Sequence, residues 1–363
     1  MFELYFVYLR ALKKLIKMIN KIDTEIIDCI KRNIESSSKE IYDEIKVSVS
    51  YATVKRILTK LTSENLIITT GKGKGTKYVI SPAYELLEPI DIEKYYEKEV
   101  DERKIKEKYN RTLIQDTLKN THVFTAVEIR ELASLQELYK NNISQLSTAE
   151  FNKELERLAI DLSWKSSQIE GNTYTLLETE RLLKQKETAS GKTKEEAVML
   201  LNHKEALDFI IEQPQYLVPL SLAKIEDIHS LLIKELAIDK NIRKRRVGIT
   251  GTNYRPLDNE FQIKEAITSM CDIINKKKNV FEKALLTLVL ISYIQPFADG
   301  NKRTARIVSN AILIHNKYCP ISFRTVDSVD YKKAMLLFYE QNNISQIKEI
   351  FINQFEFAVN SYF

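Results

Sequence analysis

Two apolar segments separated by a short polar turn constrain this chain more than any other feature. Residues 284–294 and 307–314 are mostly apolar, and residues 295–306 between them read Gln-Pro-Phe-Ala-Asp-Gly-Asn-Lys-Arg-Thr-Ala-Arg. The pattern predicts a buried helix, a tight turn and a second helix. Gly300 and Asn301 suit the turn, because both residue types tolerate the left-handed backbone that a helix end needs.

The start of the second helix has the chemistry of a phosphate site. A helix N-terminus carries unpaired N–H donors and partial positive charge. Arg303 and Arg306 are three residues apart, so they share a helix face and add forked donors for phosphate oxygens. Asp299 is the one carboxylate of the loop and could hold a magnesium ion that also touches phosphates. These features predict a nucleoside-triphosphate site.

The loop resembles the signature of the Fic domain family, His-Pro-Phe-x-Asp/Glu-Gly-Asn-Gly/Lys-Arg-x-x-Arg. It matches at every specified position except the first. The resemblance implies an all-helical core and transfer of AMP from ATP, with Mg²⁺, to a hydroxyl side chain (Ser, Thr or Tyr) of a target protein. The same resemblance implies that Asp299 binds magnesium beside the nucleotide phosphates. It implies that the phosphates themselves are bound by Gly300, Asn301, Lys302, Arg303 and Arg306.

Gln295 occupies the position of the histidine that is the general base of this family. A glutamine amide forms hydrogen bonds but cannot take a proton near neutral pH, and loss of a general base typically costs on the order of 10²–10⁴ in rate. Three explanations are open: a deliberate inactivating change, a naturally weak or altered enzyme, or a pseudoenzyme that senses nucleotide. Gln295, Asn301 and Arg303 are the candidate catalytic positions.

A second motif, Ser-Ser-Gln-Ile-Glu-Gly-Asn at 166–172, resembles the inhibitory motif of the same family, with Ser166, Glu170 and Gly171 in register. The apolar spacing of residues 148–169 predicts an amphipathic helix that ends at Glu170. A carboxylate is disfavoured at a helix C-terminus and needs a cationic partner. The resemblance makes Arg306 that partner, so that Glu170 would exclude the γ-phosphate. The alternative is an ordinary helix end at Gly171.

Residues 247–261 contain two glycines, an Asn and a Pro around short β-formers, which predicts a β-hairpin. The segment resembles the Fic flap, which implies that an extended segment of a target protein docks on it. The alternative is an ordinary surface hairpin. The resemblance also implies an aromatic side chain beside adenine in the tail, where Tyr331 and Tyr339 are the candidates, and the alternative is ordinary packing. The further nucleotide-binding candidates are therefore Gly248, Ile249, Thr250, Gly251 and Tyr331.

Residues 20–82 read as a separate unit of three helices and two strands around a Gly-Lys turn, which is typical of a winged helix. Residues 1–82 hold fifteen Lys and Arg against nine Asp and Glu, a net of +6, whereas the whole chain is +5. The concentrated charge is compatible with DNA binding, and the alternative is a protein-binding or dimerising module. The candidate DNA contacts are Ser50, Tyr51, Thr53, Arg56, Lys72 and Lys74.

The sequence thus predicts a mainly α protein: a Fic helical bundle with a short β-hairpin flap, preceded by a winged helix-turn-helix domain. The charge pattern of residues 83–122 predicts a solvated helical linker. Thr175 with Glu178 and Thr193 with Glu196 have the spacing of capping boxes. The expected boundaries are 1–82 for the winged helix, 83–122 for the linker and 123–363 for the Fic domain, with its inhibitory helix at 148–171 and its core at about 175–345.

Composition bounds the setting and the partners. Cys29, Cys271 and Cys319 are widely scattered, which is typical of reduced thiols in a cytoplasm, and no apolar run is long enough to span a bilayer. The expected partners are a target protein on residues 247–261 and DNA, with homo-oligomers left open and no membrane. An alternative to the enzyme is a non-enzymatic, ATP-responsive regulator whose winged helix binds DNA or protein.

Overall fold

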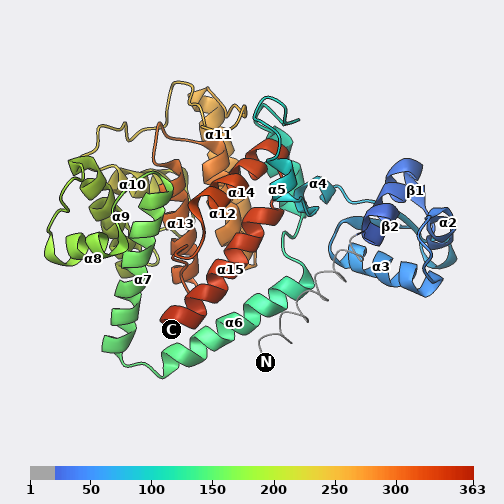
Figure 1. Cartoon of the computed structure of the whole chain (residues 1–363), viewed down its shortest axis with the longest axis horizontal. Helices are drawn as coiled ribbons and strands as arrows, with labels where there is room; N and C mark the ends of the chain where they lie inside the picture. The colour runs from blue at the N-terminus through green and yellow to red at the C-terminus, as the bar shows by residue number, and fades with distance from the viewer. Residues whose placement is uncertain (1–20) are drawn as a thin grey trace. The chain divides into compact units, whose positions relative to one another are not determined.

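The computed structural model describes residues 21–363 and forms two compact units (Figure 1). Among the described residues, the first comprises 21–88 together with Phe124–Ala126, and the second comprises Pro89–Val123 and Val127–Phe363. Residues 1–20 of the predicted winged helix lie outside the described residues.

The first unit is a small helical module with one antiparallel sheet. Helical residues 21–33 precede β1 (Glu35–Ser36), α2 (Ser38–Glu44) and α3 (Tyr51–Ser63), and β2 (Ile67–Thr70), the turn η1 (Gly73–Gly75), β3 (Lys77–Ile80) and α4 (Tyr84–Leu87) follow. The strand order is β1-β3-β2. Val54, Ile57, Leu58 and Leu61 of α3 are buried, so this helix packs its apolar stripe inward. The elements occur in the predicted order, and the winged-helix assignment stays a prediction.

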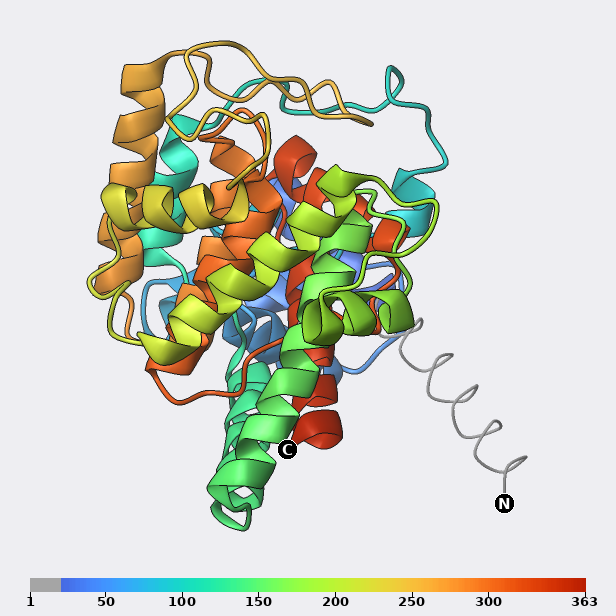
Figure 2. The ribbon, with the colours of Figure 1, turned by 90° about the vertical axis from the view of Figure 1, so that its left-hand side faces the viewer.

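The core of the second unit is α12 (Val280–Ile294) followed by α13 (Asn301–His315). Nearly every side chain of α12 is buried, including the polar Thr287 and Ser292, whose hydroxyls donate to backbone carbonyls one turn earlier. A helix that is apolar on all sides has to be enclosed by other helices. Figures 1 and 2 show this pair, in orange, between α7, α9 and α10 and the red helices α14 and α15.

Three of the surrounding helices begin with capping boxes. In each, a Ser or Thr oxygen accepts from the third helical N–H, and a Glu side chain accepts from the backbone N–H of the cap. These caps are Ser147 with Glu150, Thr175 with Glu178 and Thr193 with Glu196. The surrounding helices are α6 (Ala126–Ser144), α7 (Thr148–Ile169), α8 (Leu176–Gln185), α9 (Lys194–Glu212), α10 (Leu222–Leu232), α11 (Glu260–Lys276), α14 (Ser328–Gln341) and α15 (Ser345–Tyr362).

The predicted linker helix is wrong for residues 97–108, which contain no helix. Elsewhere in the predicted linker, the regular elements are α4, α5 (Ile92–Tyr95) and a helical segment at 111–120 that contains the π-helical turn η2 (Leu113–Leu118). Most residues between 97 and 108 are exposed, which agrees with a solvated segment. The segment and its start are nevertheless tied to α14, because Tyr95 Oη donates to Glu340 Oε2 over 2.7 Å and the Lys106 N–H donates to the Glu340 carbonyl over 2.8 Å.

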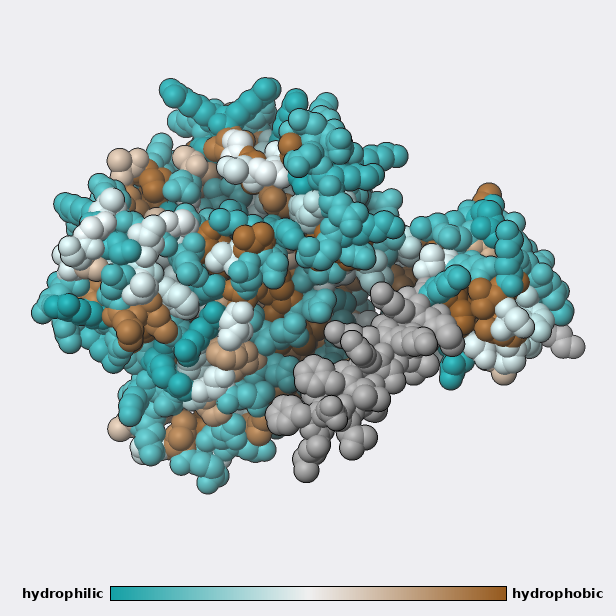
Figure 3. Space-filling view, viewed as in Figure 1, coloured by the Kyte–Doolittle hydropathy of each residue, from teal (hydrophilic) through white to brown (hydrophobic). Residues whose placement is uncertain are grey.

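The visible surface of the second unit is mostly hydrophilic, with apolar residues in small scattered patches (Figure 3). Among residues 21–363, none of the helices has the length and apolarity needed to cross a membrane. Cys29, Cys271 and Cys319 are buried free thiols.

Candidate nucleotide-binding site

The turn between α12 and α13 uses two left-handed residues. Gln295 closes α12 with φ 53° and donates its N–H to the Ile291 carbonyl, and Gly300 precedes α13 with φ 79°. A Cβ at Gly300 would lie 3.4 Å from the His229 ring, which adds a packing reason for glycine. No side chain caps the start of α13. The first N–H groups of this helix are therefore available to an anion.

Asn301 holds the turn together from inside. Its Oδ1 accepts the Phe297 N–H over 2.8 Å, and its Nδ2 donates to the Phe297 carbonyl and to Gln295 Oε1, both over 2.9 Å. The side chain is almost fully buried. The motif predicted Asn301 as a site residue, and its observed contacts position the loop.

The Gln295 side chain is buried and engaged at both ends. Its Nε2 donates to the Ser292 carbonyl over 2.6 Å, and its Oε1 accepts from Asn301. An amide in this setting bridges the end of α12 to α13 but has no basic lone pair for a proton near neutral pH.

Two residues that the sequence did not single out hold the other side of the turn. The His229 ring stacks on Phe297 at 3.7 Å, and its Nε2 lies 3.0 Å from the Asp299 carbonyl oxygen. Arg243 donates through Nε to the Gln295 carbonyl over 2.6 Å and through its N–H to the Pro296 carbonyl over 3.0 Å. Burial lowers the pKa of His229, although its two carbonyl contacts oppose that shift. No local pattern marks either residue, because their partners are more than fifty positions away.

Arg303 and Arg306 form the buried floor behind the turn. Arg303 is 1% and Arg306 0% exposed. Arg303 reaches only Asp299, with Nη2 to Oδ2 at 3.4 Å, and its Nε and Nη1 are buried without a protein partner. Burial lowers the pKa of Arg303. Two guanidinium groups with unmatched buried donors need an acceptor, and phosphate oxygens have the right geometry.

Glu170 supplies the countercharge to this floor. It lies at the C-terminal cap of α7, where its Oε1 is 2.7 Å from Arg306 Nη2 and its Oε2 is 3.4 Å from Lys302 Nζ. Arg306 also donates to Ser166, through Nε to Oγ over 2.8 Å and through Nη2 to the carbonyl over 3.0 Å. Burial alone would raise the pKa of Glu170, but the charges of Arg306 and Lys302 lower it. The predicted partner of Glu170 was Arg306, and the two side chains are in contact. The contact of Ser166 with Arg306 was not predicted, and the inhibitory role of Glu170 stays a prediction.

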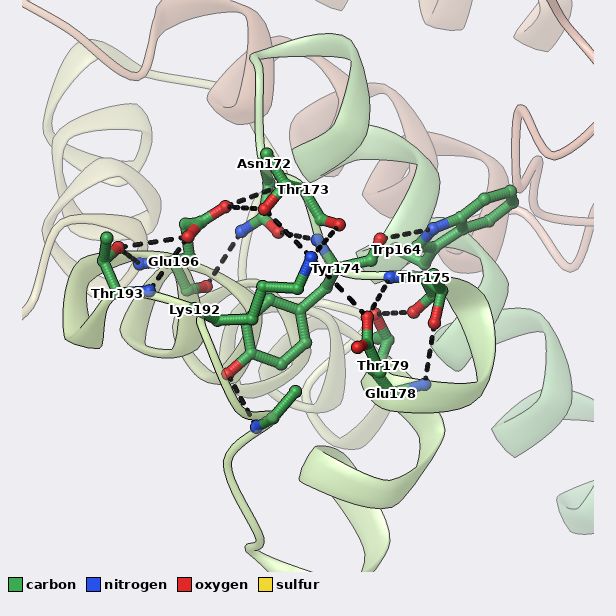
Figure 4. A network of polar contacts seen from close by, with 11 residues as sticks. Trp164, Asn172, Thr173, Tyr174, Thr175, Glu178, Thr179, Lys192, Thr193 and Glu196 are labelled. Carbon is green, nitrogen blue, oxygen red and sulfur yellow. Dashed lines mark hydrogen bonds and ion pairs between the residues drawn. The ribbon is translucent and has the colours of Figure 1, made fainter.

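The chain immediately after Glu170 is fixed by a polar network (Figure 4). Glu196, in the capping box of α9, accepts from the N–H and the hydroxyl of Thr173 over 2.7 and 2.6 Å, and Asn172 donates to the Glu196 carbonyl over 2.9 Å. Trp164 of α7 donates to the Tyr174 carbonyl over 3.0 Å. Gly171, with φ 101°, makes the bend. The end of α7 is thus anchored on both sides of Glu170.

A cavity of about 630 Å³ opens in front of the turn. This volume is in the range of small-ligand sites. It brings together eleven of the predicted site residues, whereas Arg303, Arg306, Ser166 and Gly171 are not among its lining residues. The eleven are Glu170, Gly248, Ile249, Thr250, Gly251, Gln295, Asp299, Gly300, Asn301, Lys302 and Tyr331. The lining residues that sequence reasoning did not predict for the nucleotide include Tyr96, Arg103, Val329, Lys332, Lys333 and Leu336.

The predicted flap is present as a loop, and the expected β-hairpin is wrong: residues 247–257 form no strand. Their polar groups pair outside the loop. The Arg255 N–H donates to the Glu107 carbonyl over 2.7 Å, and Asn253 Nδ2 donates to Asp101 Oδ1 over 2.8 Å. Tyr254 is buried and donates to the Tyr293 carbonyl. Because backbone and side-chain groups of the loop find hydrogen-bond partners in other segments, the loop is held in place without strand pairing in a hairpin.

Tyr331 lies at the cavity but also at the arginine floor. It is fully buried, and the Arg306 guanidinium carbon is 5.4 Å from its ring centroid. Its hydroxyl has no protein partner. Tyr339, about two helical turns further along α14, also lines the cavity and is fully buried.

Asp299 has the properties of a ligand for a metal that arrives with its substrate. Its side chain is 66% exposed, and its Oδ1 accepts the Gly300 N–H over 2.6 Å. Within residues 21–363, His, Cys, Asp and Glu side chains do not gather in threes or more as a resident metal site would need. Mg²⁺ is commonly held by one carboxylate plus substrate phosphates and waters, so a single exposed carboxylate fits it.

In the first unit, the residues predicted to contact DNA are only partly free. Arg56 and Lys72 are exposed. Ser50 caps α3 by accepting the Thr53 N–H over 3.2 Å, and Tyr51 Oη lies 2.7 Å from Ser38 Oγ. The side chain of Lys74 lies outside the described part of the structure.

Comparison with known proteins identifies the domain. Residues 219–313 match the model of the Fic/DOC family, so the chain contains a Fic/DOC domain. It is 29% identical over 176 residues to "Protein adenylyltransferase Fic" of Nematostella vectensis, covering 46% of this chain and 40% of that protein. It is 31% identical over 99 residues to a "Probable protein adenylyltransferase" of Aquifex aeolicus, covering 27% of this chain and 31% of that protein. The matched regions thus span less than half of either relative.

The fold comparison agrees with the family match. The solved structure of Fic-1 from Caenorhabditis elegans superposes with a TM-score of 0.58 at 19% identity, covering 65% of this chain and 72% of that one. At this identity the likeness shows a shared fold.

Proposed function

We propose that the second unit binds Mg-ATP and transfers AMP to a Ser, Thr or Tyr hydroxyl of a target protein docked on the flap. One observation carries the proposal: the uncapped start of α13, with Arg303 and Arg306 behind it, faces a ligand-sized cavity inside a Fic/DOC domain. The names of the two relatives support the same reaction.

In the proposed reaction the target hydroxyl oxygen attacks the α-phosphorus, the bond to the β-phosphate breaks, and pyrophosphate leaves. The amides of Asn301 and Lys302 bind the phosphates, joined by that of Gly300 where Asp299 Oδ1 releases it, and Arg303 balances the charge that builds up on them. Asp299 would hold Mg²⁺, which when bound neutralises phosphate charge. The flap residues from Gly248 to Gly251 cover the nucleotide.

The hydroxyl proton needs an acceptor, and Gln295 does not provide one. We infer that this sequence binds nucleotide but transfers AMP on the order of 10²–10⁴ more slowly than it would with histidine at this position. We further infer that Glu170 inhibits by holding Arg306, so that the γ-phosphate lacks its partner. The missing base and the inhibitory contact affect the same pocket, and each can be reversed by its own substitution.

The test is self-labelling with ATP that carries radioactive α-phosphate. We expect a Glu170→Gly, Gln295→His double variant to label itself or added protein, and each single variant to label far less. The matched control is the same double variant incubated with ATP that carries radioactive γ-phosphate. It should remain unlabelled, because AMP transfer leaves the γ-phosphate in pyrophosphate. Absence of α-label in a double variant that binds ATP would refute the enzyme proposal.

The second candidate is a non-enzymatic, ATP-responsive regulator, and the observation behind it is Gln295 in place of a general base. It would be supported by ATP binding to Glu170→Gly protein without labelling in any histidine-restored variant. In that case ATP would displace Glu170, and the first unit would report the change to DNA or to a protein partner.

A further inference from the structure

The strap, which we define as residues 96–110, lies outside the segment that matches the Fic/DOC model but closes the same cavity. Its Arg103 bridges two elements: Nη2 donates to the Gly251 carbonyl of the flap over 2.6 Å and lies 3.1 Å from Glu340 Oε1 of α14. Glu340 is fully buried, so this ion pair is enclosed. Arg103 therefore ties the flap to α14 from the N-terminal side of the domain.

Further contacts hold the strap along its length. Tyr96 Oη donates to the Lys333 carbonyl of α14 over 2.8 Å, and Gln341 Nε2 donates to the Lys104 carbonyl over 2.7 Å. Lys108 pairs with Arg255 of the flap in a parallel bridge. The strap is thus a fixed wall between flap and helix, built from a region whose composition suggested a solvated linker.

The cavity has two differently built ends. The turn before α13 supplies amides and cations for phosphates. The other lining comes from the strap, with Tyr96 and Arg103, and from α14, with Val329, Tyr331, Lys332, Lys333, Met335, Leu336 and Tyr339. The apolar and aromatic groups of this wall suit a nucleoside, and its two lysines add positive charge beside them.

Arg103 has the geometry of a stacking residue. Its guanidinium carbon lies 4.8 Å from the centroid of the Tyr96 ring, its side chain is only 7% exposed, and its Nε is buried without a protein partner. A planar guanidinium on an aromatic ring forms a flat, polarisable surface, which is the kind that contacts nucleobases.

We propose that Tyr96 and Arg103 are specificity-determining residues that bind the nucleoside part of the nucleotide and make the pocket prefer ATP over bare polyphosphate. The inference rests on the proposed nucleotide function, and it adds a contact surface that belongs to the strap. Tyr96 and Arg103 act on ligand binding here and have no part in proton transfer.

The experiment is calorimetric titration of full-length Glu170→Gly protein, the parent, with ATP and with inorganic triphosphate. Arg103→Ala and Tyr96→Ala are compared with Arg111→Ala, an exposed arginine that follows the strap and does not line this cavity. Arg103→Lys is included because it keeps a charge opposite Glu340 while losing the planar fork, so it separates misfolding from lost stacking. Thermal unfolding of each variant reports folding.

We expect ATP affinity to fall about tenfold or more in the Tyr96 and Arg103 variants, since stacking on one base is typically this strong, with triphosphate affinity and Arg111→Ala unchanged. Equal losses for both ligands in folded protein would overturn the inference and leave the strap a scaffold. Unchanged ATP affinity in folded Arg103→Lys and Tyr96→Ala would overturn it as well. A parent that binds neither ligand would refute the nucleotide function itself, which is a distinguishable outcome.

Discussion

Arg306 is a buried cation whose charge is balanced by Glu170, and this pair links stability to ligand binding. Removing one partner of a buried pair leaves the other uncompensated and typically costs several kcal/mol. We expect Glu170→Gln to lower the free energy of unfolding of the ligand-free protein by on the order of 3 kcal/mol. ATP should restore most of this loss, because its γ-phosphate would take the place of the carboxylate.

Thermal unfolding with and without ATP measures both parts of this prediction. Wild-type protein should gain little from ATP, and Glu170→Gln should gain several degrees. Glu150→Gln, a capping glutamate at the other end of α7, is the control that should show no ATP-dependent difference. An equal ATP effect in wild type and Glu170→Gln would contradict the exchange of partners.

At the scale of single residues, the sequence predicted the positions of those residues whose placement depends on local spacing. Glu170, Asn301 and Arg306 are fixed relative to helix ends, so their motifs carry their positions. His229 and Arg243 were not predicted as site residues, because they contact the loop from segments distant in sequence. Neither periodicity nor composition encodes a contact of this kind. The same holds for Arg103, whose partners lie about 150 and 240 positions away.

At the scale of elements, the predicted capping boxes of α8 and α9 are present in the structure. Glu196, in the capping box of α9, shows how such a cap can stabilise the chain that follows Glu170. Hydrogen bonds from the Thr173 hydroxyl and from the Thr193 backbone lower the pKa of Glu196 from 4.5 to about 2. A lowered carboxyl pKa adds stability that is complete above about pH 4.5 and is lost as the pH falls toward 2.

We therefore expect Glu196→Gln to be less stable than wild type at pH 7 and the difference to shrink between pH 4.5 and pH 2. Urea unfolding at pH 7, 4.5 and 3 measures it. Glu195→Gln, an exposed neighbour in the first turn of α9, should show a smaller and less pH-dependent change. A constant difference between wild type and Glu196→Gln across this range would refute the role of the charged form.

The flap and the strap show why some elements could not be predicted. Both are irregular, and each is ordered by the other through contacts such as that of Arg255 with Glu107. Hairpin signals describe local turn preference, and they fail where backbone groups find partners in a distant segment. The helices of the core, by contrast, followed from apolar spacing because burial of α12 leaves little choice of partner surface.

At the scale of the whole molecule, charge is divided unequally along the chain. Residues 1–82 carry a net of +6 and the whole chain +5, so the remainder is close to neutral. This division predicts that any affinity for nucleic acid resides in the first unit, with the exposed Arg56 and Lys72 among its contacts.

The prediction is that the full chain binds duplex DNA weakly and in a salt-dependent manner, as electrostatic contacts with phosphate require. Lys72→Ala should weaken binding to all sequences about equally and reduce the slope of log affinity against log salt by about 1. Lys184→Ala, an exposed lysine of α8 paired with Glu180, is the matched control and should leave the slope unchanged. Fluorescence anisotropy with a random duplex at several salt concentrations measures both. Binding that is absent at low salt, or a slope that responds equally to both changes, would favour the alternative in which this unit contacts protein.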